Sequence, residues 1–159
     1  MLYIAIVIYA VAMTVANLTI AAFGPWVSPI NAFFLIGLDL TLRDWLQTRL
    51  NQVQMLCLII ASGLVTYLAN PSAHMIAIAS AVAFTGAAFV DWSVFTKAKG
   101  TWLAEANKSN VAGAAVDSLI FPTIAFGSLM PHIVLMQFAA KVGGGFVWSY
   151  VFSKLRGNA

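Results

Sequence analysis

Residues 2–23 read LYIAIVIYAVAMTVANLTIAAF, an apolar run without a single charged side chain. An α-helix needs about 20 consecutive apolar residues to cross the hydrocarbon core of a bilayer, so this run is long enough to span one. It is longer than the apolar core of a cleavable signal peptide, and no Lys or Arg precedes it. We therefore expect residues 2–23 to form the first transmembrane helix.

The composition of the whole chain points to the same class of protein. Of its 159 residues, 62% are hydrophobic and only 8% are charged. A soluble domain carries about 25% charged residues, so this chain has too few polar groups to cover its surface. The sequence predicts an all-α integral membrane protein whose surface contacts the lipid bilayer.

Several functional classes are excluded at this stage. The formal net charge of +3 comes from dispersed basic residues, so we expect no nucleic acid partner. The chain has one cysteine, Cys57, and no Cys/His cluster, so we expect neither a metal site nor a cofactor. No nucleophile elbow, metalloprotease motif, phosphate loop or nucleotide fingerprint is present. The chain is therefore expected not to be an enzyme and not to hydrolyse ATP.

Five further apolar segments follow the first. Pro29 suits the first turn of a helix, where its missing N–H needs no partner, and Asn70-Pro71-Ser72 is a turn signal that ends a helix. The connections are short, which favours antiparallel neighbours in one compact bundle of six transmembrane helices, a single domain over residues 1–159. The five helices are expected at about residues 29–45, 52–69, 73–95, 109–129 and 132–152.

The distribution of basic residues predicts how the bundle lies in the membrane. Short loops that are rich in Lys and Arg stay on the cytoplasmic side. The first, third and fifth connections have none, so the other loops and both termini are expected to be cytoplasmic, in a multi-pass protein of the cytoplasmic (inner) membrane. The basic residues on that side are Arg43, Arg49, Lys97, Lys99, Lys108, Lys154 and Arg156.

Ionisable residues inside the predicted helices are candidates for function. An ionised side chain at the bilayer centre costs roughly 2.5–3.5 kcal/mol, so each needs a partner, water or a purpose. Each could form a structural ion pair, could reach the lipid headgroups, or could line a shared polar cavity. The set holds three acids and two cations, so one acid must be protonated, hydrated or matched by a ligand. Its members are Asp39, Arg43, Asp91, Asp117 and Lys141.

Helix-disrupting residues lie close to two of these charges. Pro122 removes a backbone hydrogen bond just after Asp117 and is expected to bend the helix there. Gly144, Gly145 and Trp148 follow Lys141 on the same helical face. Interrupted helices beside buried charges are typical of transporter binding sites, whereas small residues alone also serve helix packing. Both interpretations stay open for the glycines.

Several residue blocks together carry a resemblance to a known family. These blocks are Asn17, Asp39-Leu40-Thr41-x-Arg43, Asp91 with Val94-Phe95, Ser109, Asp117-Ser118-Leu119, Ile124-Ala125-Phe126 and Lys141-Val142. They cover nearly the full chain. By these blocks the chain resembles the queuosine precursor transporters of the vitamin uptake transporter (VUT) family, the YhhQ-like proteins.

This resemblance implies uptake of 7-deazaguanine bases, chiefly 7-cyano-7-deazaguanine (preQ0) and its aminomethyl relative (preQ1). A guanine-like edge presents two adjacent N–H donors, which the carboxylate of Asp117 or Asp39 could accept. We expect Lys141 to donate to the ring carbonyl and an aromatic ring to stack on the base. The expected substrate-binding set is completed by Trp148, Phe121 and Asn17, with Arg43 and Asp91 as an ion pair that gates the path.

Two other functions stay open. The chain could be the substrate-binding membrane subunit of a larger ATP-driven vitamin importer, because small-residue stripes would allow docking to a partner. It could also be a small channel or pore protein, although such a protein would not need the intramembrane acids and lysine. Six short helices make a small bundle, so a homodimer is also plausible.

Overall fold

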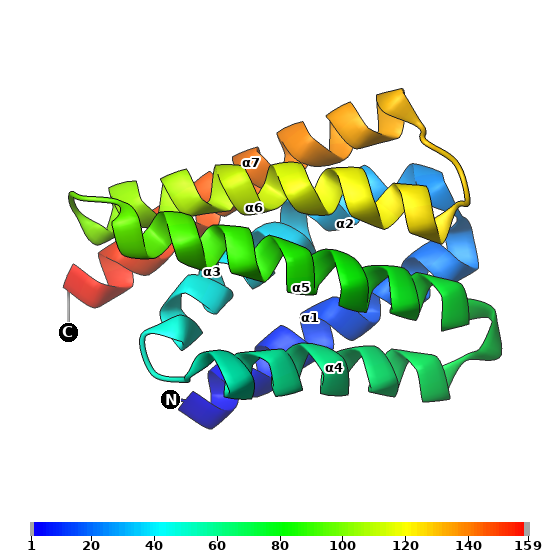
Figure 1. The fold of residues 1–159 in the computed structure, drawn as a ribbon, viewed down its shortest axis with the longest axis horizontal. Coiled ribbons are helices and arrows are strands. Elements are labelled where there is room, and N and C mark those ends of the chain that lie inside the picture. The colour runs from blue at the N-terminus through cyan, green and yellow to red at the C-terminus, as the bar shows by residue number, and fades with distance from the viewer. Residues whose placement is uncertain (1, 158–159) are drawn as a thin grey trace.

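The computed structural model describes the backbone of residues 2–157 and the side chains of residues 2–155 (Figure 1). The predicted domain limits, residues 1–159, therefore include residues 1, 158 and 159 outside the described part. The five long helices are α1 (Leu2–Phe23), α4 (Gln52–Ala69), α5 (His74–Lys97), α6 (Trp102–Ala125) and α7 (Pro131–Gly157).

The remaining helical segment lies between α1 and α4, is the second span in chain order, and consists of short pieces. Its middle is a π-helical turn, in which the N–H of Gly37 bonds to the carbonyl of Ala32. Turns of this kind widen a helix by one residue and occur at functional sites more often than elsewhere. The pieces are η1 (Pro25–Val27), α2 (Ser28–Asn31), η2 (Ala32–Ile36) and α3 (Gly37–Gln47), and a further short turn, η3 (Pro71–Ala73), precedes α5.

The all-helical membrane class is confirmed. The described residues form six helices, counting Pro25–Gln47 as one, and no strand. Four of the six are long and apolar enough to cross a membrane: α1, Pro25–Gln47, α4, and α5 with its preceding turn. Helices α6 and α7, with 24 and 27 residues, are also long, but they carry more polar residues. Those residues include Asp117 and Lys141, which are buried inside the bundle.

The two ends of the bundle differ in charge. Helix α1 begins and α7 ends at the same end, where the α3–α4 and α5–α6 connections also lie (Figure 1). Exposed Arg49, Lys97 and Lys99 lie in or beside these connections. This arrangement agrees with the sequence-based topology, while the cytoplasmic position of that end remains a prediction. The side chain of Arg156 lies outside the described residues.

Helices α6 and α7 differ from their predicted ranges at three boundaries. Helix α6 begins at Trp102 rather than near residue 109, because the Thr101 hydroxyl caps it by accepting a hydrogen bond from the Ala104 N–H at 3.3 Å. It ends at Ala125, ahead of Gly127, whose φ of 68° is not helical. Helix α7 continues to Gly157, beyond residue 152. The earlier start of α6 and the later end of α7 arise because polar helical turns extend past the apolar segments that the sequence reveals.

Helix α4 has a reciprocal cap at its first turn. The Asn51 side chain accepts a hydrogen bond from the Gln54 N–H at 2.9 Å, and the Gln54 side chain accepts one from the Asn51 N–H at 3.0 Å. Such a capping box satisfies two backbone donors that the helix itself leaves free.

Replacing Asn51 is therefore expected to weaken the protein modestly. Asn51→Ala should lower the free energy of unfolding by about 1 kcal/mol, because the Gln54 N–H loses its acceptor. Thermal unfolding of the purified protein in detergent measures the change. Gln52→Ala, at an exposed neighbouring position, is the control and should have almost no effect. Equal losses in both variants would contradict the role of the cap.

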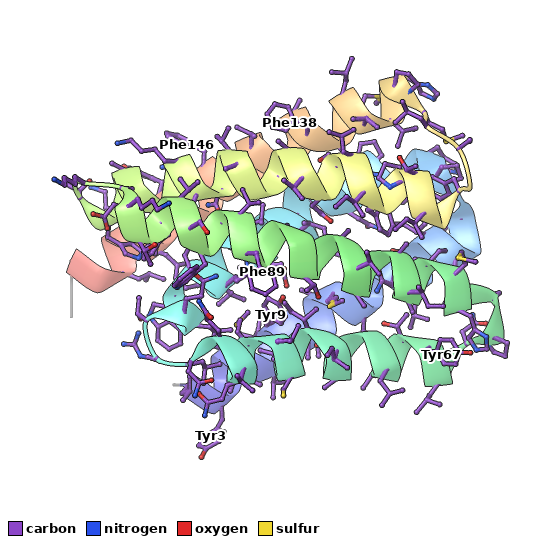
Figure 2. All side chains as sticks on the ribbon, viewed as in Figure 1. Tyr3, Tyr9, Tyr67, Phe89, Phe138 and Phe146 are labelled. Carbon is purple, nitrogen blue, oxygen red and sulfur yellow. The ribbon has the colours of Figure 1, made fainter. Side chains whose placement is uncertain are left out.

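The side chains of α1 separate a lipid-facing stripe from a core stripe. Tyr3 is 81% exposed and points away from the bundle, whereas Tyr9 is fully buried and lies within it (Figure 2). Tyr9 packs in a cluster with Met13, Leu40 and Ile59 from three helical segments. Exposed large apolar side chains occur on all the long helices, as expected where the solvent is lipid.

Helix α7 crosses the second span, Pro25–Gln47, in direct backbone contact. A Cβ atom on Gly144 would lie 2.1 Å from the carbonyl oxygen of Phe33, and one on Gly37 would lie 2.6 Å from the carbonyl carbon of Gly144. Neither position accepts any side chain without movement of the backbone. The Phe33 carbonyl belongs to the π-helical turn, so that turn and Gly144 meet at one point. This contact fixes the depth of α7 beside the second span.

Candidate functional site

A buried ion pair joins α6 to α7. The Lys141 Nζ lies 2.7 Å from Oδ2 of Asp117, and each side chain is 2% exposed. The same Nζ donates to Oε1 of Gln137 at 2.8 Å and to Oγ of Ser118 at 3.2 Å. All three ammonium protons are thus used, while Oδ1 of Asp117 has no hydrogen-bond partner. The charges of Lys141 and Asp117 balance each other, yet Oδ1 of Asp117 remains able to accept a hydrogen bond.

This ion pair lines a small cavity in the bundle interior. The cavity has a volume of about 20 Å³, room for about one water molecule. A binding pocket for a small molecule usually measures about 300–1,000 Å³, so the protein is closed around the site in this conformation. The side chains and backbone that enclose it belong to Ala16, Asn17, Ile20, Ser28, Asn31, Ala32, Ile36, Ser80, Phe84, Asp117, Phe121, Gln137 and Lys141.

Hydrogen bonds hold the polar wall of this cavity on the α1 side. The Ser80 hydroxyl donates to Oδ1 of Asn17 at 2.5 Å, and the Asn17 amide donates to Thr66 at 3.5 Å. Asn31, from α2, donates to the carbonyl of Ala16 at 3.1 Å. Asn17 therefore connects α1 to both α4 and α5, and the cavity is enclosed by residues from α1, α2, η2, α5, α6 and α7.

A second buried charge cluster lies toward the basic end of the bundle. The Arg43 Nε lies 3.4 Å from Oδ2 of Asp91, and both side chains are fully buried. Gln47 donates to the same carboxylate oxygen at 3.3 Å. Helix α6 approaches closely here, because a Cβ on Gly113 would lie 3.0 Å from Nη2 of Arg43. The pair thus connects α3 to α5, and α6 packs closely against it because Gly113 has no side chain.

The count of buried charges differs from the sequence-based one. Asp44 is fully buried and accepts a hydrogen bond from Ser109 at 3.3 Å. The sequence analysis did not include it among the ionisable residues inside the helices. The described residues therefore bury four carboxyl groups against two basic groups, Arg43 and Lys141, rather than three against two.

Asp39 occupies a different place from the one expected. It is fully buried, and neither of its carboxylate oxygens has a hydrogen-bond partner. It interacts electrostatically with Arg43 and Asp117, which lie in the two charge clusters. It does not line the small cavity among the described residues. Asp39 is therefore buried outside the cavity lining and interacts electrostatically with one member of each cluster.

The predicted site residues thus divide into two groups. Asn17, Asp117, Phe121 and Lys141 meet around the cavity. Trp148 does not line it among the described residues, because its indole N–H donates instead to the carbonyl oxygen of Phe34 at 3.1 Å. Phe34 belongs to the π-helical turn, where the backbone hydrogen bonding differs from that of an α-helix.

Several residues that the sequence analysis missed complete the cavity. The most direct is Gln137, four residues before Lys141, which accepts from the lysine and donates to the Ser28 hydroxyl. The spacing of four would have placed Gln137 on the lysine face. Ser80 was hidden in a run of small residues, and Asn31 in a segment read only as apolar.

A larger groove opens between α4 and α5 near the basic end. Its volume is about 600 Å³, and most of its lining is apolar. Gln47 lines this groove and also donates to Asp91, so one side chain connects the groove to the buried Arg43–Asp91 pair. The groove is lined by Gln47, Leu50, Asn51, Gln52, Val53, Met55, Leu56, Ile59, Thr85, Ala88, Phe89 and Trp92.

Comparison with known proteins gives a family match. A family model described as "Putative vitamin uptake transporter" matches residues 1–153. The match includes every residue that lines the cavity and both buried ion pairs. No curated protein and no solved structure matches the chain.

Proposed function

Because the chain belongs to the vitamin uptake transporter family, we propose that it imports queuosine precursors across the cytoplasmic (inner) membrane. The proposed substrates are 7-cyano-7-deazaguanine and related 7-deazaguanine bases. In this proposal residues 1–159 act as one transmembrane domain, with all six helices in the bilayer and both termini in the cytoplasm. The basic residues at the end where α1 begins and α7 ends support that orientation.

The observation that carries the substrate class is the Asp117–Lys141 pair beside Phe121 at a closed cavity. A carboxylate can accept the two adjacent N–H groups of a guanine-like edge with both oxygens. A lysine can donate to the ring carbonyl on the same edge, and a phenylalanine ring can stack on the flat base. The amide of Asn17 supplies a further polar contact at the opposite wall.

The contacts of Asp117 and Lys141 in this closed conformation indicate how the base could bind between them. Lys141 now occupies Oδ2 of Asp117, and Oδ1 has no hydrogen-bond partner. A bound base would donate to both carboxylate oxygens and accept from the ammonium group through its carbonyl. Gln137 and Ser118 would keep their bonds to Lys141 during this exchange. Neither charge of the Asp117–Lys141 pair would then be left without a partner, which is the condition for binding at low cost.

The Arg43–Asp91 pair is proposed as the inner gate of the path. It lies between the cavity and the basic end of the bundle, and Gln47 connects it to the groove between α4 and α5. Separation of α3 from α5 at this pair would join the cavity to the groove. The groove volume of about 600 Å³ is large enough for a bicyclic base.

The test is uptake of radiolabelled 7-cyano-7-deazaguanine by liposomes that contain the purified chain. The wild-type protein should show saturable uptake. An analogue without the exocyclic amino group should compete at least about tenfold more weakly, because a charge-assisted hydrogen bond to Asp117 contributes roughly 1.5–3 kcal/mol. Asp117→Asn should reduce this discrimination, since an amide cannot accept two donors on one edge.

Other outcomes would point to the other functions. Binding without translocation would indicate a substrate-binding subunit of an ATP-driven importer, and ion conductance without saturable competition would indicate a pore. Equal competition by bases with and without the amino group would contradict the proposed substrate class. We also propose a homodimer, which crosslinking in native membranes would detect as a band of doubled mass.

A further inference from the structure

The bundle interior holds more acids than the basic groups beside them can balance. Asp117 pairs with Lys141, and Asp91 pairs with Arg43. Asp44 accepts a hydrogen bond from Ser109, whereas Asp39 has no such bond. An ionised carboxylate without a partner is very unfavourable in the interior of a membrane protein. In this conformation Asp39 therefore needs a bound proton or another cation, because Arg43 faces Asp91.

The buried ionisable groups that act on Asp39 lie on α1, α3 and α6. Tyr9, on α1, interacts electrostatically with Asp39, and its hydroxyl group also lacks a hydrogen-bond partner. Arg43 lies one turn further along α3 and faces Asp91 of α5. Asp117 of α6 also acts on Asp39, and its charge is balanced by Lys141 of α7. Asp39 and Asp44 are thus the two acids that the ion pairs leave unbalanced, and of these only Asp39 has no hydrogen-bond donor on either oxygen.

A proton suits this position better than a metal ion. A bound cation such as Na⁺ needs several oxygen ligands, whereas a proton needs one carboxylate oxygen. The part of the chain that the structure describes contains no group of three or more His, Cys, Asp or Glu residues that could hold a metal ion. The guanidinium group of Arg43, on the same helical face, would also repel a second cation.

Arg43 has free hydrogen-bond donors that can replace such a proton at Asp39. Its Nε faces Asp91, while Nη1 and Nη2 have no hydrogen-bond partner. Residues four apart on a helix share a face, so a change of side-chain conformation would bring these two nitrogens to the Asp39 carboxylate. Only the ionised carboxylate would accept both donors. A contact between Arg43 and Asp39 would therefore form as the proton leaves.

We propose that Asp39 binds one proton from outside and releases it inside for each substrate molecule that enters. This inference rests on the proposed import function and adds its driving force. In the closed conformation the carboxyl group is protonated and needs no cation. When the Arg43–Asp91 gate opens inward, the free nitrogens of Arg43 pair with Asp39, and the proton passes through the open gate.

The test compares accumulation with exchange in liposomes at zero membrane potential. The wild-type protein should concentrate labelled base up to about tenfold for each unit of inward pH gradient, the limit for one proton per molecule. Asp39→Asn should lose this accumulation, because an amide cannot carry the proton. It should still exchange internal for external base within about twofold of the wild-type rate. Asp44→Asn, at a neighbouring buried acid, is the control and should keep the accumulation.

Each alternative result would overturn one named part of the proposal. Wild-type exchange without any effect of the pH gradient, or accumulation driven by Na⁺, would refute proton coupling and leave the import proposal intact. Accumulation by Asp39→Asn, or its loss in Asp44→Asn alone, would refute the assignment to Asp39. If Asp39→Asn does not fold, Asp39→Glu must retain the pH response, and its loss there would count against the inference. Absence of wild-type exchange would refute the import function itself.

Discussion

Lys141→Met is expected to abolish uptake and to lower the free energy of unfolding by roughly 3–5 kcal/mol. The methionine side chain has a similar volume but cannot pair with Asp117, whose carboxylate lies 2.7 Å from the lysine in the wild-type protein. Removal of the lysine also leaves Gln137 without its donor. Uptake in liposomes and thermal unfolding in detergent measure the two effects separately.

A double variant separates the structural role of the pair from its functional role. Lys141→Met combined with Asp117→Asn leaves no buried charge, so most of the lost stability should return. Uptake should stay at least about 30-fold below the wild-type rate, because the groups proposed to bind the base are missing. Lys154→Met, at an exposed lysine of the same helix, should change stability by less than about 0.5 kcal/mol. Normal uptake by the double variant would show that the pair only stabilises the bundle.

Gly144→Ala is expected to be the most damaging methyl addition in α7. The new Cβ would lie 2.1 Å from the Phe33 carbonyl oxygen, a backbone atom that cannot move aside alone. The helices must separate, which also disturbs the contact with Gly37, and the loss should be about 3 kcal/mol or more. The unfolding temperature in detergent and the yield of uptake-competent protein measure it.

The neighbouring glycine provides a matched control. A Cβ on Gly143 would lie 3.5 Å from the Phe33 ring, an ordinary van der Waals contact. Gly143→Ala adds the same methyl group to the same helix and should change stability by less than about 1 kcal/mol, since alanine also favours helix. Similar losses in both variants would contradict the role of the backbone contact at Gly144.

The membrane class and most helix positions could be predicted from the sequence because they depend on local properties. Apolar length decides whether a segment spans the bilayer, and charged loops decide how neighbouring spans alternate. The start of α6 was less accessible, because Thr101 caps a polar turn that apolar length does not reveal. The π-helical turn at Ala32–Ile36 has no sequence signal in a single chain.

The candidate site was predictable in part for the same reason. The intramembrane positions of Asp117 and Lys141 predicted that they need partners, and they are each other's partner. The position of Trp148 was less predictable, because its indole N–H bonds to Phe34, a contact that depends on how α7 crosses a distorted helix. Asp44 was missed because its depth depends on tertiary packing, since Ser109 comes from a distant helix.

The cavity of about 20 Å³ has a consequence for any affinity measurement. A ligand that enters only a rarely populated open form binds more weakly than its contacts alone would allow, in proportion to the fraction of molecules that are open. If about 1% of molecules were open, the measured dissociation constant would be about 100-fold above the intrinsic one. An antibody fragment that binds only the open form should therefore raise the apparent affinity for the ligand without contacting it.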